Sequence, residues 1–341
     1  MGHRLLGKTP DELKMIAIEA GLPPFAGKQL AQWLYGKRVR TIDQMTNLSK
    51  AGREALAREW EVGLSAPLGN ALSSDGTRKY LFPVNGDASN AVEAVMIPDD
   101  DRKTLCVSSQ AGCKMGCRFC MTGRQGFHGQ LDAADILSQF FAIEEAADLT
   151  NAVFMGMGEP LDNWEQVKRV IEVLTAPWGL AWSPKRITLS TVGVLPKVRQ
   201  YLEECRCHLA VSLHNPFPEE RLELMPVEKA WPSHEVIDLL KQYDFTGQRR
   251  VSFEYTLFAG WNDSKRHADA LVRLLRGLEC RVNLIRFHRI PDFPYTTPSQ
   301  VQMEAFRDRL SAGGVTATIR ASRGEDILAA CGLLAGKHNE R

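Results

Sequence analysis

The chain of 341 residues has no long apolar run and no recognisable leader segment. Its longest stretch without a charged residue is Val62–Ser74, which has 13 residues and includes Gly, Ser, Asn and Pro. No segment is therefore apolar or long enough to span a bilayer. Residues Met1–Leu6 lack the apolar centre of a signal peptide. We expect a cytoplasmic protein that does not associate with membranes.

The sequence also lacks an excess of charge of one sign. It has 42 Lys and Arg residues against 41 Asp and Glu residues, which gives a net charge of +1. Proteins that bind polyanions non-specifically are usually more basic. A balanced total can conceal a local basic face, so nucleic-acid binding is neither required nor excluded. The apolar fraction of 44% is ordinary for a globular chain and excludes a disordered or collagenous one.

Small helices are predicted for the first 63 residues. Thr9-Pro10-Asp11-Glu12 has the N-cap, the proline and the acidic first turn that begin a helix. Ala26–Tyr35 and Ser49–Trp60 are the next helical candidates, and the basic turn Lys37–Arg40 follows the first of these. This turn favours an RNA-facing module over a cap that only stabilises the rest. We assign residues 1–68 to it.

A segment rich in small polar residues separates this module from the rest. Gly69–Gly86 is expected to be a linker, although Asp75-Gly76 predicts a hairpin turn and Lys79–Val84 a short strand. Ala91–Ile97 is predicted as another strand. We therefore describe residues 69–102 as a linker with a β-hairpin extension.

From about residue 103, strand-like apolar runs alternate with helical segments. The predicted strands are Thr104–Ser108, Ala152–Met157, Arg186–Thr191, His208–His214, Val251–Phe258 and Arg281–His288. The predicted helices between them are Asp132–Ala147, Trp164–Leu174, Leu195–Glu204, His234–Tyr243 and Ser264–Arg276. This alternation predicts an α/β fold with a parallel sheet over residues 103–292. A partly closed barrel and an open doubly wound sheet both fit.

Residues 293–341 form a predicted C-terminal extension. It contains a helix over Pro298–Ser311, a strand over Val315–Ala321 and a last helix over Gly324–Leu334.

The strongest chemical signal is a cysteine cluster in the loop after the first of these strands. Cys113, Cys117 and Cys120 have the spacing C-x3-C-x2-C. A tetrahedral zinc site would need a fourth ligand, such as Cys106 or His128. Three thiolates on a four-iron cluster instead leave one iron open to a cofactor that has an amino and a carboxylate group.

With an aromatic residue, Phe119, before its last cysteine, this loop resembles that of the radical S-adenosylmethionine (SAM) superfamily. The segment Met155-Gly-Met-Gly-Glu-Pro160 resembles the part of that superfamily that meets the SAM amino group. The positions that this resemblance assigns to SAM binding are Phe119, Gly158, Glu159, Ser190, Ser212, Leu213 and His214. Most lie where predicted strands end, and barrel enzymes place their active sites at that end. The resemblance implies a partial (βα)6 TIM-like barrel, a [4Fe-4S] cluster and SAM.

A closer resemblance covers nearly the whole chain, up to about Gly336. The matching segments are LCVSSQAGC (105–113), GRQGF (123–127), FMGMGEPL (154–161), SLHNP (212–216), RLELMP (221–226) and RGEDILAACG (323–332). They resemble the RNA (adenine-C2)-methyltransferase family RlmN and its sister group Cfr, which methylates C8 of the same adenine. One position departs from the family, because His288 stands where the family usually has an asparagine that contacts the SAM ribose.

This resemblance implies a specific chemistry. One SAM would methylate Cys331, and a second SAM would yield a 5′-deoxyadenosyl radical that activates this methyl group for addition to the base. Cys106 would help to remove the ring proton and would release the product by forming a disulfide with Cys331. Glu93 matches a family acid that accepts a proton.

The resemblance also implies partners. These are 23S rRNA, tRNA and an electron donor such as flavodoxin, and the chain would be a monomer. C8 methylation, a radical SAM reaction on a substrate other than RNA, and a non-catalytic metal-containing RNA-binding protein are the alternatives.

Overall fold

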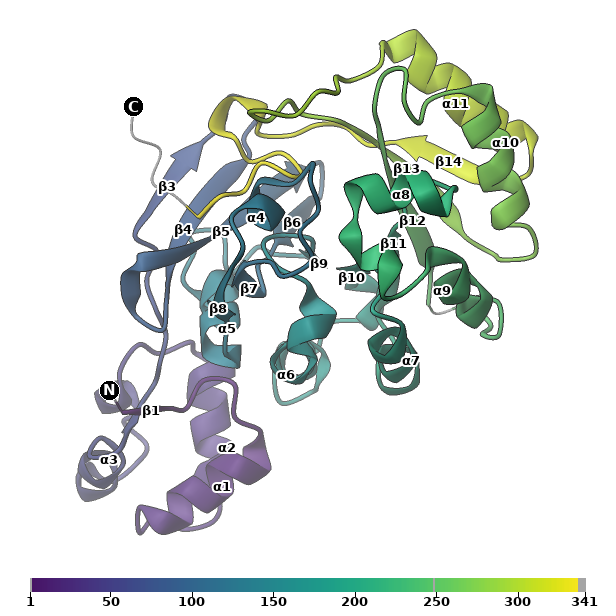
Figure 1. The fold of residues 1–341 in the computed structure, drawn as a ribbon. Coiled ribbons are helices and arrows are strands. Elements are labelled where there is room, and N and C mark those ends of the chain that lie inside the picture. Colours follow the sequence, from purple (N-terminus) through teal and green to yellow (C-terminus); the bar gives the residue numbers. More distant parts are fainter. Residues whose placement is uncertain (1, 248, 337–341) are drawn as a thin grey trace.

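A curved sheet forms the centre of the computed structural model, which describes residues 2–247 and 249–336 (Figure 1). Its parallel strands are β6 (Arg102–Cys106), β9 (Asn151–Phe154), β10 (Ile187–Thr191), β11 (His208–Ser212), β12 (Val251–Leu257), β13 (Arg281–Arg286) and β14 (Thr316–Ile319). Each pairs in parallel with the next in this order. The six predicted parallel strands and the strand of the C-terminal extension are therefore confirmed.

The strand order distinguishes the two predicted architectures. A doubly wound sheet reverses its strand order at a switch point, whereas β6 to β14 follow the chain without reversal. The crossover helices lie along the outer side of the curved sheet (Figure 1). These helices are α5 (Ala133–Phe141), α6 (Trp164–Thr175), α7 (Leu195–Glu204), α9 (Ser233–Leu240), α10 (Lys265–Leu274) and α11 (Gln300–Ala312). The short helix α8 (Pro218–Leu224) instead lies at the carboxyl ends of β10 and β11. The fold is a partial barrel.

Antiparallel strands extend the sheet on the other side of β6. They are β3 (Gly69–Leu72), β4 (Arg78–Val84) and β5 (Asp87–Asp99), and they bring the sheet to ten strands within the described residues. The expected linker over Gly69–Gly86 is thus wrong, because both β3 and β4 belong to the main sheet. The predicted Asp75-Gly76 turn joins them, with Gly76 at a φ of +83° that a side chain would disfavour.

The N-terminal helices pack below the sheet (Figure 1). They are α1 (Pro10–Glu19), α2 (Ala26–Ala31), which continues as a π-helical turn, and α3 (Lys50–Leu56). The predicted cap is confirmed: Thr9 Oγ1 accepts from the N–H of Glu12, and the Glu12 carboxylate accepts from the N–H of Thr9 at 2.7 Å. A short parallel pair, β1 (His3–Arg4) and β2 (Trp60–Glu61), was not predicted.

The C-terminal segment differs most from the expectation. The predicted helix over Gly324–Leu334 is wrong, since within the described residues it contains a single 3-10 turn, Glu325–Ile327. Gly324 and Leu328, on either side of this turn, have the left-handed backbone conformation, which stops an α-helix from extending. The segment crosses back over the concave side to lie beside β4 and β5 (Figure 1).

The cysteine loop has its own small frame. It lies between β7 (Gln110–Gly112) and β8 (Phe127–Gln130), which pair antiparallel, and it contains the short helix α4 (Met121–Arg124). Among the described helices, none combines the length and the apolar character needed to cross a membrane.

Candidate active site

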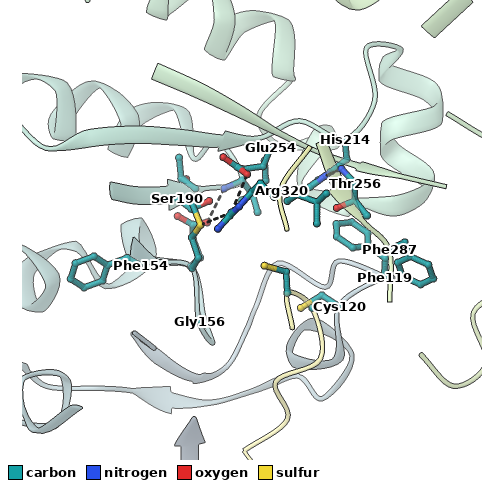
Figure 2. A pocket seen from close by; sticks show the side chains of 18 of the residues that line it. Phe119, Cys120, Phe154, Gly156, Ser190, His214, Glu254, Thr256, Phe287 and Arg320 are labelled. Carbon is teal, nitrogen blue, oxygen red and sulfur yellow. Dashed lines mark hydrogen bonds and ion pairs between the residues drawn. The ribbon is translucent and has the colours of Figure 1, made fainter. Parts of the chain in front are cut away.

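A cavity opens where the parallel strands of the barrel end (Figure 2). Its lining combines cysteine, acidic, basic and aromatic side chains from many separate elements. The lining residues used below are Phe119, Cys120, Met155, Gly158, Glu159, Ser190, Val192, Ser212, His214, Glu254, Thr256, Arg286, Arg320 and Cys331. The cavity thus unites most of the residues that the sequence assigned to SAM binding with one cluster cysteine and Cys331.

The cysteine loop is held tightly in front of this cavity. The N–H of Cys113 donates to the carbonyl of Gly126 at 2.8 Å, and the N–H of Cys120 donates to the carbonyl of Cys117 at 3.2 Å. At Gly112 a β-carbon would lie 1.9 Å from the Gly126 carbonyl oxygen. Only glycine therefore lets the loop close in this way.

The thiols of this loop fit an iron–sulfur cluster better than a single ion. Burial raises the pKa of all three thiols, that of Cys113 to about 12, and the neighbouring thiols raise it further. At neutral pH these three cysteines are therefore thiols, and they become thiolates only when a metal binds to them. Among the described residues, no group of three or more Cys, His, Asp and Glu side chains is placed to hold one ion. Thiolates that each bind a different iron stand further apart than the ligands of one zinc ion.

The two residues considered as a fourth zinc ligand are engaged elsewhere. The His128 ring lies 3.1 Å from the carbonyl of Gln125. Cys106 lies at the end of β6, where its neighbours are Arg320 and Cys331.

Glu159 supplies a buried carboxylate to the cavity. It is 2% exposed and accepts hydrogen bonds from the N–H groups of Leu161 and Val192 at 3.1 and 2.9 Å. Burial raises its pKa to about 7, although these N–H groups oppose the rise. A buried carboxyl group of this kind ionises more readily when a positively charged or hydrogen-bond-donating group is bound beside it, because such a group lowers its pKa.

His214 is held as a neutral ring at the other side of the cavity. Its Nδ1 accepts from the N–H of Thr256 at 2.9 Å, and its backbone has the unusual φ of +59°. Its ring meets that of Phe119 edge-on, with 4.8 Å between ring centroids. Burial, helped by the charge of Arg221, lowers its pKa to about 3. The ring can therefore pack against a cofactor without carrying charge.

An arginine outside the set of residues predicted for the site also reaches into the cavity. The Arg320 guanidinium lies 3.4 Å from the Glu254 carboxylate and 3.4 Å from the sulfur of Met155 (Figure 2). Its charge opposes the rise in the pKa of Cys106. Arg320 follows β14, whereas Glu254 lies in the middle of β12, and both residues line the cavity. For Arg320 the signal that could have identified it is a charged residue near the end of a predicted strand, and for Glu254 it is a charged residue inside an apolar predicted strand.

Cys331 and Cys106, predicted as a reactive pair, lie close enough for Cys331 to contribute to the raised pKa of Cys106. Cys331 is exposed and lines the cavity near Cys120. Cys106 is buried at the end of β6, and burial, followed by the nearby Cys331, raises its pKa to about 12. The structure thus places one exposed thiol at the cavity wall and a second, buried thiol near it.

Three other predicted residues lie outside the cavity lining. The Glu93 carboxylate bonds to Lys79 at 2.8 Å and accepts from the N–H groups of Ala335 and Gly336 at 2.7 and 3.2 Å. The His288 ring lies 3.1 Å from the hydroxyl of Ser322. Leu213 is buried. Their assigned roles stay predictions.

The barrel, its cysteine loop and the cavity at the strand ends define an enzyme of the radical SAM superfamily. The family model of the radical SAM superfamily matches residues 107–271, and that of the ribosomal RNA large subunit methyltransferase N-terminal domain matches residues 3–62. The cofactors of this class are a [4Fe-4S] cluster and SAM, which the donor set described above fits.

Known relatives narrow the assignment further. The chain is 58% identical over 99% of its length to a probable dual-specificity RNA methyltransferase RlmN of Parabacteroides distasonis, and covers 98% of that protein. It is 41% identical over 96% of its length to RlmN of Syntrophus aciditrophicus, of which it covers 94%. A crystal structure of a radical SAM methyltransferase from Sphaerobacter thermophilus superposes with a TM-score of 0.91 at 38% identity, covering 98% of this chain and all of that one. The chain belongs to the RlmN family.

Proposed function

We propose that this enzyme methylates C2 of an adenine in the peptidyl-transferase centre of 23S rRNA, and also an adenine of tRNA. The observation that supports this most directly is Cys331 at the wall of the SAM cavity, with Cys106 behind it. A radical SAM enzyme that only cleaves SAM needs no such pair. The named relatives are dual-specificity RNA methyltransferases.

The chemistry explains why a cysteine carrier is needed. An aromatic C–H carbon is a poor nucleophile towards the electrophilic methyl group of SAM. When bound, the cluster and SAM supply a carbon radical strong enough to take hydrogen from a methyl thioether. Cys331 would carry that methyl group as a thioether, made from one SAM while a second SAM is cleaved, and present it to the base.

Cys106 would then release the product. Once the adduct had lost its ring proton to a nearby base and its unpaired electron to the oxidised cluster, the Cys106 thiolate would attack the sulfur of Cys331. An S–S bond would form and the carbon–sulfur bond to the base would break. The carbon left on the base takes a proton and becomes the new methyl group, and an external dithiol reduces the disulfide. Arg320 favours this step because its positive charge stabilises a thiolate at Cys106.

Glu93 would act as proton acceptor only after a local rearrangement. Its carboxylate is engaged by Lys79, Ala335 and Gly336 in the present arrangement. The role therefore requires the C-terminal segment to release it.

The other parts of the chain have supporting roles in this proposal. Residues 1–68 would contact RNA, residues 69–102 extend the sheet, residues 103–292 bind the cofactors, and residues 293–341 carry the methyl-bearing cysteine. Because its substrates are 23S rRNA and tRNA, the enzyme would act in the cytoplasm. An electron donor such as flavodoxin would reduce its cluster.

RNA mass spectrometry tests the proposed reaction. A strain without its own C2 enzyme, complemented with this chain, should contain 2-methyladenosine in 23S rRNA and tRNA. The GRQGF segment resembles the C2 group more than the C8 group. Detection of 8-methyladenosine alone would overturn the C2 assignment.

The variant Cys331→Ala tests the carrier role. It should keep the iron content and visible spectrum of the wild type but transfer no methyl group to RNA. Cys280→Ala is the matched control, because Cys280 lies outside the cavity lining. Methylated RNA made by Cys331→Ala would refute the methyl-cysteine route.

A further inference from the structure

A second groove continues from the active-site cavity towards the edge strand β14. It is lined by Arg286, Gln300, Arg307 and residues 317–322. Arg286 and Arg320 line both the groove and the cavity. The two spaces are therefore neighbours that share two positively charged side chains.

The groove is basic and its guanidinium groups come from three different parts of the chain. Arg286 ends β13, Arg307 lies on α11, and Arg320 follows β14. Of the described residues that line the groove, none is acidic.

Two of these arginines already have partners that fix their positions. Arg286 donates to the Oε1 atom of Gln300 at 2.5 Å, and Gln300 in turn donates to Glu304 at 2.8 Å. Arg320 is oriented by Glu254 on the cavity side. Both groups are thus positioned before any ligand arrives.

Arg307 is the adaptable member of the set. Its side chain is 37% exposed and pairs at 2.8 Å with the neighbouring Asp308, which is 66% exposed. Exposed pairs of this kind contribute little to stability. Arg307 can therefore exchange Asp308 for a ligand at small cost.

We propose that this groove binds a phosphodiester group of the RNA strand next to the target nucleotide. The proposal rests on the proposed function. A base that enters the cavity must leave its stack, while its backbone phosphates stay outside. Guanidinium groups bind phosphate through paired charge-assisted hydrogen bonds. A phosphate in the groove would hold the strand while its base occupies the cavity.

The helix that carries Arg307 also provides a matched control. Arg309 has the same side chain on the same helix, but it forms a two-pronged ion pair with Asp269 of α10 at 2.6 and 2.7 Å, away from the groove. The variants Arg307→Gln and Arg309→Gln each remove one positive charge from α11. Non-specific charge effects should be similar in both.

The test compares these variants with the wild type in binding an RNA fragment of the peptidyl-transferase loop. Arg307→Gln should bind about fivefold more weakly, and the slope of log affinity against log salt should become less negative by about 0.7, as expected for one lost contact to single-stranded phosphate. In methylation assays the loss should appear in KM more than in kcat. Arg309→Gln should match the wild type.

The remaining outcomes are decisive as well. Equal RNA affinity and salt slope for the two variants would overturn the proposal, even if the wild type methylates the fragment. A wild type that binds RNA without methylating it would contradict the proposed function, and the binding comparison would still decide the role of the groove. Saturable binding of inorganic phosphate that Arg307→Gln abolishes, with unchanged RNA affinity, would assign the groove to free phosphate and refute the RNA contact.

Discussion

At the scale of single residues, Arg221 connects the strand ends that form the cavity. It is 0% exposed, and its guanidinium donates to the carbonyls of Val192, Ser212 and Leu213, each at 2.9 Å. Its remaining partner is the buried carboxylate of Glu228. Val192 follows β10 and Ser212 ends β11, so one side chain fixes the relative position of two strands whose ends line the cavity.

Replacing Arg221 should therefore cost much stability. Arg221→Met leaves Glu228 buried without its charged partner, and breaking a buried pair in this way costs about 3–5 kcal/mol. The double variant Arg221→Met/Glu228→Leu should recover part of this loss, since no lone charge remains. Urea unfolding of the three proteins measures both effects. A double variant less stable than Arg221→Met would show that Glu228 matters mainly through its bonds to Ser233.

Glu159 gives the cavity a pH dependence. Its pKa in the folded chain is raised from 4.5 to about 7 by burial. Between these values the folded state holds a proton that the unfolded state releases, so this group lowers stability as pH rises. An iron-bound SAM amino group that donates its N–H to Glu159 would favour the ionised form of the carboxylate. SAM affinity of the cluster-loaded enzyme should thus rise from about pH 6 to about pH 8.

The variant Glu159→Gln isolates this effect. It should bind SAM more weakly and show a flat profile over the same pH range, measured by equilibrium binding. A wild-type profile that is equally flat would mean that Glu159 does not contact the SAM amino group.

The spacing of the motifs predicted well which residues line the cavity. It predicted less well which partner each of these residues contacts. Cys120, Glu159, Ser190, Ser212, His214 and Cys331 are brought together as expected. Glu93 and His288 point to other partners, because the path of the C-terminal segment decides their surroundings. Arg320 and Glu254 form their ion pair across strands that are distant in sequence. The sequence pattern around either residue cannot predict an ion pair with a residue this far away in the chain.

At the scale of elements, the C-terminal segment shows how tertiary bonds override a helical pattern. The N–H of Gly324 donates to Asp75 at 2.9 Å, the hydroxyl of Ser73 donates to Asp326 at 2.5 Å, and the hydroxyl of Thr122 donates to the carbonyl of Leu334 at 2.8 Å. These bonds connect the segment to the β3–β4 turn and to the cysteine loop. The position of Cys331 is therefore set by contacts outside its own segment.

Weakening this attachment should loosen the segment selectively. Asp326→Ala removes the acceptor for Ser73 and for the N–H of Ser74. Amide hydrogen exchange over residues 324–336 should then be about threefold faster, because local opening needs less free energy. Asp238→Ala is the control, since Asp238 is 68% exposed and its ion pair among the described residues is a long one, to Lys241 at 3.8 Å. Equal exchange rates in both variants would show that the other bonds suffice.

At the scale of the whole molecule, the N-terminal module and the barrel share one continuous apolar core. Leu5 and Leu34 of the module belong to the same cluster of buried side chains as Phe154 of the barrel. A second, smaller core around Cys117 and Phe258 supports the cysteine loop. The alternation of strands and helices predicted the order of the barrel, but it could not predict this joint core, because the packing of separate segments has no local signature.

The ion pairs between module and barrel differ in burial, and this difference allows a final prediction. Arg4 lies 2.6 Å from Asp135, whose side chain is 2% exposed, whereas Arg169 pairs with Glu12 at sites that are 39% and 34% exposed. Arg4→Met should cost about 3 kcal/mol, since a buried carboxylate loses its charged partner. Arg169→Met should cost less than about 1 kcal/mol.

The cost of Arg4→Met should also grow with pH. Burial already raises the pKa of Asp135, and Arg4 opposes that rise. Without Arg4 the pKa rises further, so at low pH the carboxyl is neutral and the loss is small, while at neutral pH its ionisation destabilises the folded state. Urea unfolding at about pH 5 and about pH 8 measures this difference. The shared core predicts a single transition for both variants, and a module that unfolds separately in the wild type would show that the core does not couple the two parts.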